Sequence, residues 1–130
     1  SSHGKAHIHG VGVPENMWTA DHDSFLECMA DASKSIVEHY KNNIVFINVM
    51  CNISVDCDCD ANAAAPKMGD IGILASTDPV ALDQACLDLL YASDDPEKGE
   101  VIERIESRNA VETAAEIGVG SREYELITVG

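Results

Sequence analysis

The sequence has 130 residues, of which 45% are hydrophobic and 24% charged, and this composition is typical of one globular domain rather than of a disordered chain. Asp and Glu number 23 against 8 Lys and Arg, which gives a formal net charge of −15. A surface this acidic repels phosphate groups, and we therefore expect neither nucleic acid nor a membrane as partner. Cations and basic proteins are still compatible with the charge. Five cysteines and the lack of a signal peptide or transmembrane run favour a reducing, cytoplasmic location.

The amino-terminal residues raise two expectations. The first four, Ser-Ser-His-Gly, include no initiator methionine, so we expect residues 1–130 to be one domain excised from a longer protein. The segment Lys5–Val13 alternates like a strand, with His7 and His9 on one of its faces. Two histidines at this spacing are either a pair of metal ligands or exposed positions of an edge strand.

A helix is predicted next, from Asp21 or Asp23 to about Lys41. The acidic residues at its start and the lysine at its end suit the helix dipole. Its apolar residues recur at spacings of four and three, which predicts one buried stripe made of Phe25, Met29, Ala32, Ile36 and Tyr40.

Two apolar runs predict the strands of the sheet. Ile44–Met50 is almost continuously apolar, which is typical of a strand buried on both faces in a parallel sheet, and Asp70–Ala75 is the second such run. Asp78 and Pro79 then open a helix as N-cap and first helical residue. Further helices are predicted near 101–107 and 111–117, and an edge strand over 124–129. The fold class is therefore α/β, with a small, mostly parallel sheet of about four strands flanked by helices.

The segment Val55–Asp60 contains the densest group of candidate site residues. In an extended chain its acidic residues share one face and its two thiols the other, because side chains alternate between faces. Thiols at positions i and i+2 can bind zinc, copper or iron, whereas carboxylates suit harder cations. The thiols are Cys57 and Cys59, with Cys51 as a further candidate ligand, and the acidic residues are Asp56, Asp58 and Asp60.

A second candidate site follows from the predicted parallel pairing. If both strands run the same way, the segment from Cys51 to Asp60 leaves the sheet at the same edge as Ser76, Thr77 and Asp78. Ligands of open α/β sheets bind at that carboxyl edge. We therefore expect these two segments to form one ligand-binding site.

Four blocks of this sequence resemble the uncharacterised domain of unknown function 362 family; they are residues 52–59, 70–76, 78–83 and 118–126. The resemblance implies a prokaryotic iron-sulfur protein with ferredoxin-type cysteine motifs. Because the chain has no C-x2-C-x2-C run, it resembles the carboxyl-terminal part of such a protein. A 4Fe-4S cluster is then expected only in an upstream segment absent from this chain, and a ferredoxin-like segment of the same polypeptide is the expected partner.

Three functions are compatible with these patterns. The first is a metal-binding or redox-associated domain in which Cys57 and Cys59 hold zinc or iron, completed by His7, His9 or Cys51. The second is a metal-free interaction domain that docks the ferredoxin-like segment through residues 52–67. The third is a hydrolase or transferase that uses magnesium and the carboxylates of Asp56, Asp58 or Asp78.

Overall fold

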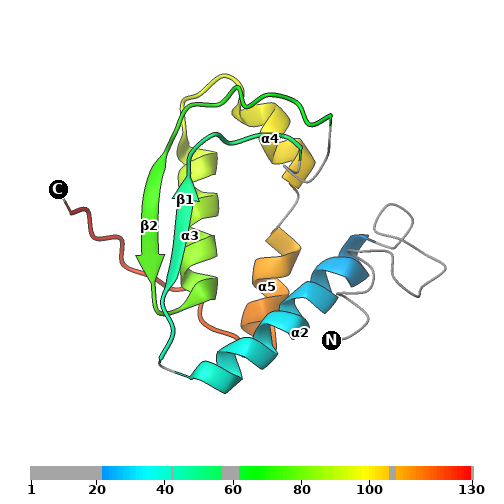
Figure 1. The fold of residues 1–130 in the computed structure, drawn as a ribbon, viewed down its shortest axis with the longest axis vertical. Coiled ribbons are helices and arrows are strands. Elements are labelled where there is room, and N and C mark those ends of the chain that lie inside the picture. The colour runs from blue at the N-terminus through cyan, green and yellow to red at the C-terminus, as the bar shows by residue number, and fades with distance from the viewer. Residues whose placement is uncertain (1–21, 42, 57–61, 106–107, 130) are drawn as a thin grey trace.

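The computed structural model describes residues 22–41, 43–56, 62–105 and 108–129, and the predicted strand Lys5–Val13 lies outside them. The described residues form a mixed α/β fold, as predicted, with four helices and a two-stranded sheet (Figure 1). Within the described residues the sheet has two strands, fewer than the expected four. In chain order the elements are α2 (His22–Tyr40), β1 (Phe46–Met50), β2 (Gly72–Ser76), α3 (Pro79–Ala92), α4 (Lys98–Ile105) and α5 (Arg108–Glu116).

The two strands are antiparallel, so the predicted parallel pairing is wrong. Phe46 pairs with Ser76 and Met50 with Gly72, which brings the chain back at the end of the sheet where it left. A parallel pair needs a crossover to the opposite end, and a helix usually makes it. The described residues of the connection between Met50 and Gly72 contain no helix.

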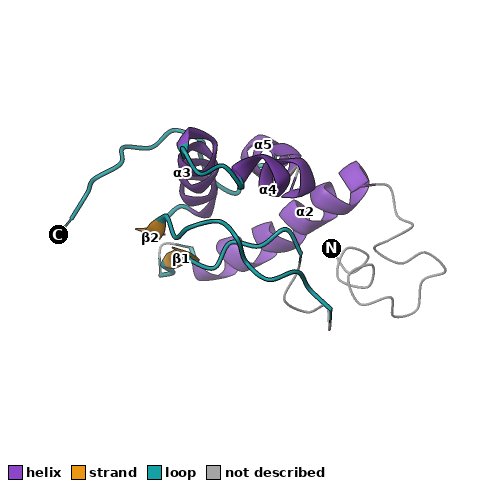
Figure 2. Cartoon of the chain, turned by 90° about the horizontal axis from the view of Figure 1, so that it is seen from above, coloured by secondary structure: helices purple, strands orange, loops and turns teal. Residues whose placement is uncertain are grey.

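Helix α3 covers one face of the sheet. Asp78 caps its first turn, accepting hydrogen bonds from the backbone N–H groups of Val80 and Ala81 at 2.9 and 3.1 Å. The helix contacts both strands, and Figure 2 shows it on one side of them with no described helix on the other. Leu82 and Leu90 are each only 4% exposed. We call the face of the sheet that α3 covers the inner face.

The opposite face of the sheet is bare within the described part of the chain. Side chains along both strands alternate between half-buried and exposed, so β1 is not buried on both faces as its composition predicts. An apolar strand needs a second covering layer to be buried twice. We call this side the outer face, and its members are Val45, Ile47, Val49, Ile73 and Ala75.

Helix α2 has the predicted extent, but its predicted stripe is buried only in part: Met29 and Ala32 are half-buried. Ile36 and Tyr40, expected in the stripe, are about half exposed, at 52% and 50%. Ala30, outside the predicted stripe, is buried, and Val37 packs against the core cluster that includes Val111 of α5. Lys34 adds a hydrogen bond from its ammonium group to the carbonyl of Ile117 at 2.7 Å.

The core consists of two small clusters on the inner side. One is built on Met68, Leu90 and Val101, and the other on Val80, Val111 and Val119. Helices α4 and α5 confirm the two predicted carboxyl-terminal helices, and each contributes one valine to the core, Val101 and Val111 respectively. After α5 the chain turns at Gly118, whose φ of 79° suits glycine, and no strand follows. The predicted strand over residues 124–129 is therefore wrong.

Candidate functional site

The predicted joint site at the carboxyl ends of the strands does not form. The antiparallel register places Cys51 beyond the Met50–Gly72 end of the sheet, while Thr77 and Asp78 follow the Phe46–Ser76 end. Two segments that leave opposite ends of a sheet cannot surround one ligand through their strand ends. The expectation failed because it depended entirely on strand direction.

Cys51 lies beside Asp70 at one end of the sheet. Asp70 accepts a hydrogen bond from the backbone N–H of Asn52 at 2.9 Å, in a turn where Asn52 has a φ of 52°. Desolvation, followed by the negative charge of Asp70 and a hydrogen bond to it, raises the pKa of the Cys51 thiol. The metal-free thiol is therefore protonated at neutral pH and is a poor nucleophile.

The segment that carries Cys57 and Cys59 begins and ends at a hydrogen-bonded neck. The Ser54 hydroxyl donates to the carbonyl of Ala64 at 3.0 Å, and the N–H of Ala64 donates to the Asp56 carboxylate at 3.0 Å. Asp56, predicted as a ligand, therefore helps to close this loop. The two cysteines, with Asp58 and Asp60, lie outside the described residues, as do His7 and His9.

The Ser76-Thr77-Asp78 turn is a structural joint. The carboxylate of Asp78 caps α3 with one oxygen, and its other oxygen accepts the N–H of Ser121 at 2.8 Å. A side chain at Gly120 would collide with this carboxylate, so only glycine fits there. Because Asp78 itself occupies the amino-terminal end of α3, that helix end is not open to an anionic ligand.

The sequence reasoning missed a polar cluster on the inner face. The Asn48 amide donates to the Asp83 carboxylate at 2.7 Å and to the Cys86 thiol at 3.4 Å, which joins β1 to α3. Desolvation raises the pKa of Cys86; the Asn48 hydrogen bond lowers it, and the charge of Asp83 raises it again. The cluster borders a cavity of about 430 Å³ between β1, α3 and α5. Its signal was Asn48, the polar residue within the apolar run 44–50.

The outer face of the sheet exposes several aliphatic side chains. Four of its side chains, Val45, Ile47, Val49 and Ile73, are each between 61% and 69% exposed. Three of them come from the two paired strands, with Val49 directly opposite Ile73, and Val45 immediately precedes β1. Scattered exposed aliphatic residues are normal, whereas a contiguous group on one face is a feature that interaction surfaces share.

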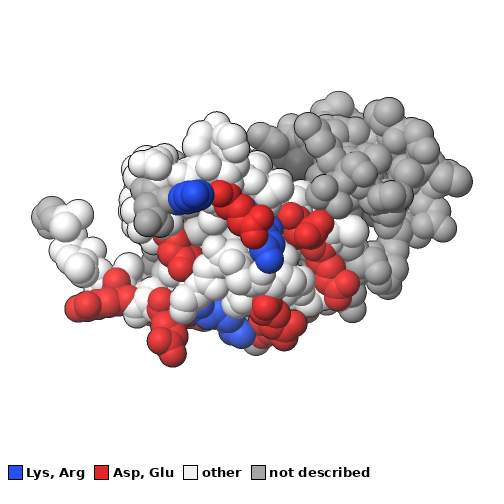
Figure 3. All heavy atoms as spheres, turned by 90° about the horizontal axis from the view of Figure 1, so that it is seen from below, with Lys and Arg blue, Asp and Glu red and all other residues white. Residues whose placement is uncertain are grey.

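Acidic side chains dominate the charge of the surface. Figure 3, which views the molecule from below, shows Asp and Glu outnumbering Lys and Arg. No group of three His, Cys, Asp or Glu side chains within the described ranges could hold a metal ion, and the three cysteines found there lie in α2, after β1 and in α3. A 4Fe-4S cluster requires four cysteine ligands, so this part of the chain does not fit one.

The family model of the domain of unknown function DUF362 matches residues 1–88. The chain belongs to this family. The match includes α2, both strands and most of α3, whereas the resembling block at residues 118–126 lies beyond it. No curated protein and no solved structure matches the chain. No helix among the described residues is long and apolar enough to cross a membrane.

Proposed function

We propose that this DUF362 domain is an interaction domain that docks another polypeptide on the outer face of its sheet. The observation that carries the proposal is the exposure of Val45, Ile47, Val49 and Ile73, four aliphatic side chains on one face. A sheet with two apolar faces is stable when both are covered, and α3 covers only the inner one. The partner to test first is the ferredoxin-like segment that the family resemblance implies.

The charge of the domain restricts the partner. At a net charge of −15, two copies of this chain repel each other at close range. A partner whose apolar surface is surrounded by neutral or basic residues avoids this repulsion and still removes the outer-face aliphatic residues from water. A segment of a different composition is therefore a better partner than a second copy.

The proposal is tested by titrating the chain with a separately produced ferredoxin-like domain of the same family polypeptide, using calorimetry. We expect Ile47→Lys together with Val49→Lys to abolish binding, because both side chains lie on the outer face. Ile36→Lys with Tyr40→Lys is the matched control, since it introduces the same charges at exposed apolar positions of α2. Equal binding by both double variants, or no binding by the native chain, would overturn the proposal.

A second candidate function, metal binding at Cys57 and Cys59, is supported by the neck at Ser54, Asp56 and Ala64. Those hydrogen bonds hold together the two ends of the segment that carries both thiols. Elemental analysis of protein purified without oxygen tests it. We expect zinc or iron that is lost in Cys57→Ser with Cys59→Ser and kept in the control Cys28→Ser with Cys86→Ser. Metal-free native protein would exclude this function for the chain.

The geometry gives less support to a magnesium-dependent hydrolase or transferase. Two of its three candidate carboxylates, Asp56 and Asp78, accept backbone N–H groups and follow opposite ends of the sheet. A catalytic carboxylate acts on the metal or substrate that it faces. We therefore put forward no reaction for this domain.

A further inference from the structure

The free edge of β2 faces an apolar groove. In the described sheet β1 pairs with one edge of β2, which leaves the other edge without a neighbouring strand. Beyond that edge lies the carboxyl-terminal segment, residues 124–129, and a cavity of about 340 Å³ separates the two. No backbone hydrogen bond joins residues 73–76 to residues 124–129 within the described structure. Two peptide segments thus line one groove without pairing across it.

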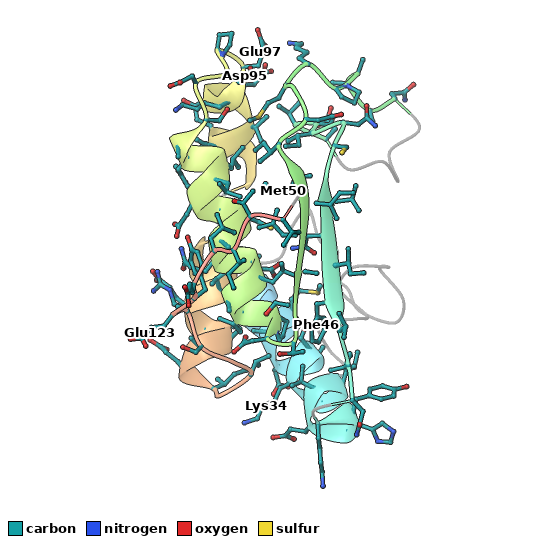
Figure 4. The ribbon with its side chains drawn as sticks, turned by 90° about the vertical axis from the view of Figure 1, so that its left-hand side faces the viewer. Lys34, Phe46, Met50, Asp95, Glu97 and Glu123 are labelled. Atoms are coloured by element: carbon teal, nitrogen blue, oxygen red, sulfur yellow. The ribbon has the colours of Figure 1, made fainter. Side chains whose placement is uncertain are left out.

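The carboxyl-terminal segment is held at its base and exposed beyond it. The Tyr124 hydroxyl donates to Asp88 of α3 at 2.7 Å, and Arg122 donates to Gln84 of the same helix at 2.8 Å. Past these anchors, Ile127 is 72% exposed. Figure 4 shows the segment rising from Glu123 across α3 toward β2. The anchors therefore fix the position of a segment whose apolar side chains have no cover.

The lining of the groove identifies the kind of occupant. Its floor is formed by Ala81, Leu82 and Ala85 of α3, and two of these are small enough to admit a close backbone. A strand pairs with its neighbour at a separation of about 4.8 Å, whereas an α-helix is about 10 Å across and satisfies its main-chain groups internally, so a strand suits a groove bordered by the unpaired edge of β2 better. Among the lining residues Glu125 is the only charged one, and it favours a basic side chain opposite it.

We propose that the groove between β2 and residues 124–129 accepts an extended segment of a partner polypeptide, which pairs as an added strand and carries aliphatic side chains with a lysine or arginine. The inference goes beyond the docking function proposed for the outer face, because it concerns a second surface, the free edge of β2 and the groove beside it. Strand addition supplies affinity through main-chain hydrogen bonds and specificity through alternate side chains. It also enlarges a two-stranded sheet, which is marginally stable by itself.

The probe for this proposal is a fluorescently labelled, amidated heptapeptide, Val-Lys-Val-Thr-Val-Lys-Val. Its control has proline in place of the central threonine, which removes a donor and disrupts strand pairing. We expect the first peptide to bind the full chain and the proline peptide to bind at least about tenfold more weakly, as expected when main-chain pairing supplies the affinity. Hydrogen exchange should slow at residues 73–76 and 126–129 in the complex.

Substitutions in the carboxyl-terminal segment sharpen the test. Glu125→Lys should weaken peptide binding about fivefold or more by placing like charges together, and Leu126→Pro should remove protection of the segment. Glu123→Lys is the matched control, because Glu123 does not line the groove. Three results would overturn the strand proposal: equal affinity for the two peptides, no peptide binding, or hydrogen exchange that does not slow at both residues 73–76 and residues 126–129. The titration with the ferredoxin-like domain, judged by Ile47→Lys and Val49→Lys, is independent of these results, because neither residue lines this groove.

Discussion

The two faces of the sheet have different surroundings. On the inner side, Leu82 and Leu90 of the covering helix α3 are almost completely buried, while Ile73 on the outer face remains 69% exposed. Hydrophobic stabilisation is proportional to the apolar surface that folding removes from water. The inner face therefore supplies stability to the chain by itself, and the outer face is available for binding. Substitutions on the two faces should affect different measurements.

Leu90→Ala is expected to have the largest effect on stability. Leu90 packs with Met68 and Val101 in one of the two core clusters, so its truncation should cost about 2–4 kcal/mol of unfolding free energy. Ile73→Ala removes a similar side chain from the outer face and should change stability by no more than about 0.5 kcal/mol. Urea unfolding of both variants measures the contrast. Equal losses would mean that the outer face is already covered when the chain is alone.

Gly120→Ala should have the next largest effect, because it disturbs the joint that holds the covering helix. A β-carbon at Gly120 would collide with the Asp78 carboxylate, which caps α3 and binds Ser121. We expect a loss of about 1–3 kcal/mol from overpacking and a weakened cap. Gly99→Ala is the matched control: no atom lies within 4 Å of the added carbon, and alanine favours helix α4 by up to about 1 kcal/mol. Thermal unfolding that is unchanged by both substitutions would argue against this joint.

Asp95 connects the chain after α3 to the segment leading into β2, and its contribution should depend on pH. Its carboxylate accepts the N–H groups of Gly69 and Glu97, both at 2.9 Å, and these bonds, the Gly69 bond first, lower the pKa of Asp95. The resulting stability is present above the unfolded pKa of about 3.9 and is lost as the pH falls through the lower folded value. In Asp95→Asn this part of the acid-induced loss should disappear.

Urea unfolding measured at neutral pH and at several pH values below about 3.9 follows the loss of the Asp95 contribution. Asp94→Asn is the control, because it removes the same charge from the adjacent exposed position. If Asp94→Asn and Asp95→Asn flatten the pH dependence equally, general charge repulsion rather than the two backbone hydrogen bonds explains the effect.

Local sequence signals predicted the individual elements well. Asp78 and Pro79 marked the start of α3 correctly, and the apolar runs located both strands to within two residues. These features depend on neighbouring residues, which the sequence displays directly. Strand direction was predicted wrongly because it depends on the path of residues 51–71, and that segment contains no periodic pattern. The joint ligand site was lost with it.

Side-chain environments were harder to predict than elements. The run 44–50 indicated burial on both faces, yet only the inner face has a covering helix among the described residues. Composition records how apolar a strand is and not which other segments cover it. The same limit explains Ile36 and Tyr40 of α2, which are exposed although they share the predicted stripe. The Asn48–Asp83 contact joins residues far apart in sequence, so no local spacing could reveal it.

The smallest predicted effect concerns Tyr124, which contacts α3 and lines the groove beside β2. Its hydrogen bond to Asp88, reinforced by burial and by the charge of that carboxylate, raises the pKa of Tyr124. This bond stabilises the anchored segment below the unfolded tyrosine pKa of about 10 and is lost as the pH rises through the higher folded value. Asp88→Asn should therefore lower the pKa of Tyr124, which a tyrosine-resolved NMR titration measures. Asp83→Asn, on the same helix but bonded to Asn48, should leave it unchanged. A Tyr124 pKa that responds to neither substitution would show that residues 124–129 are not held against α3, and the groove beside β2 would then lack its second wall.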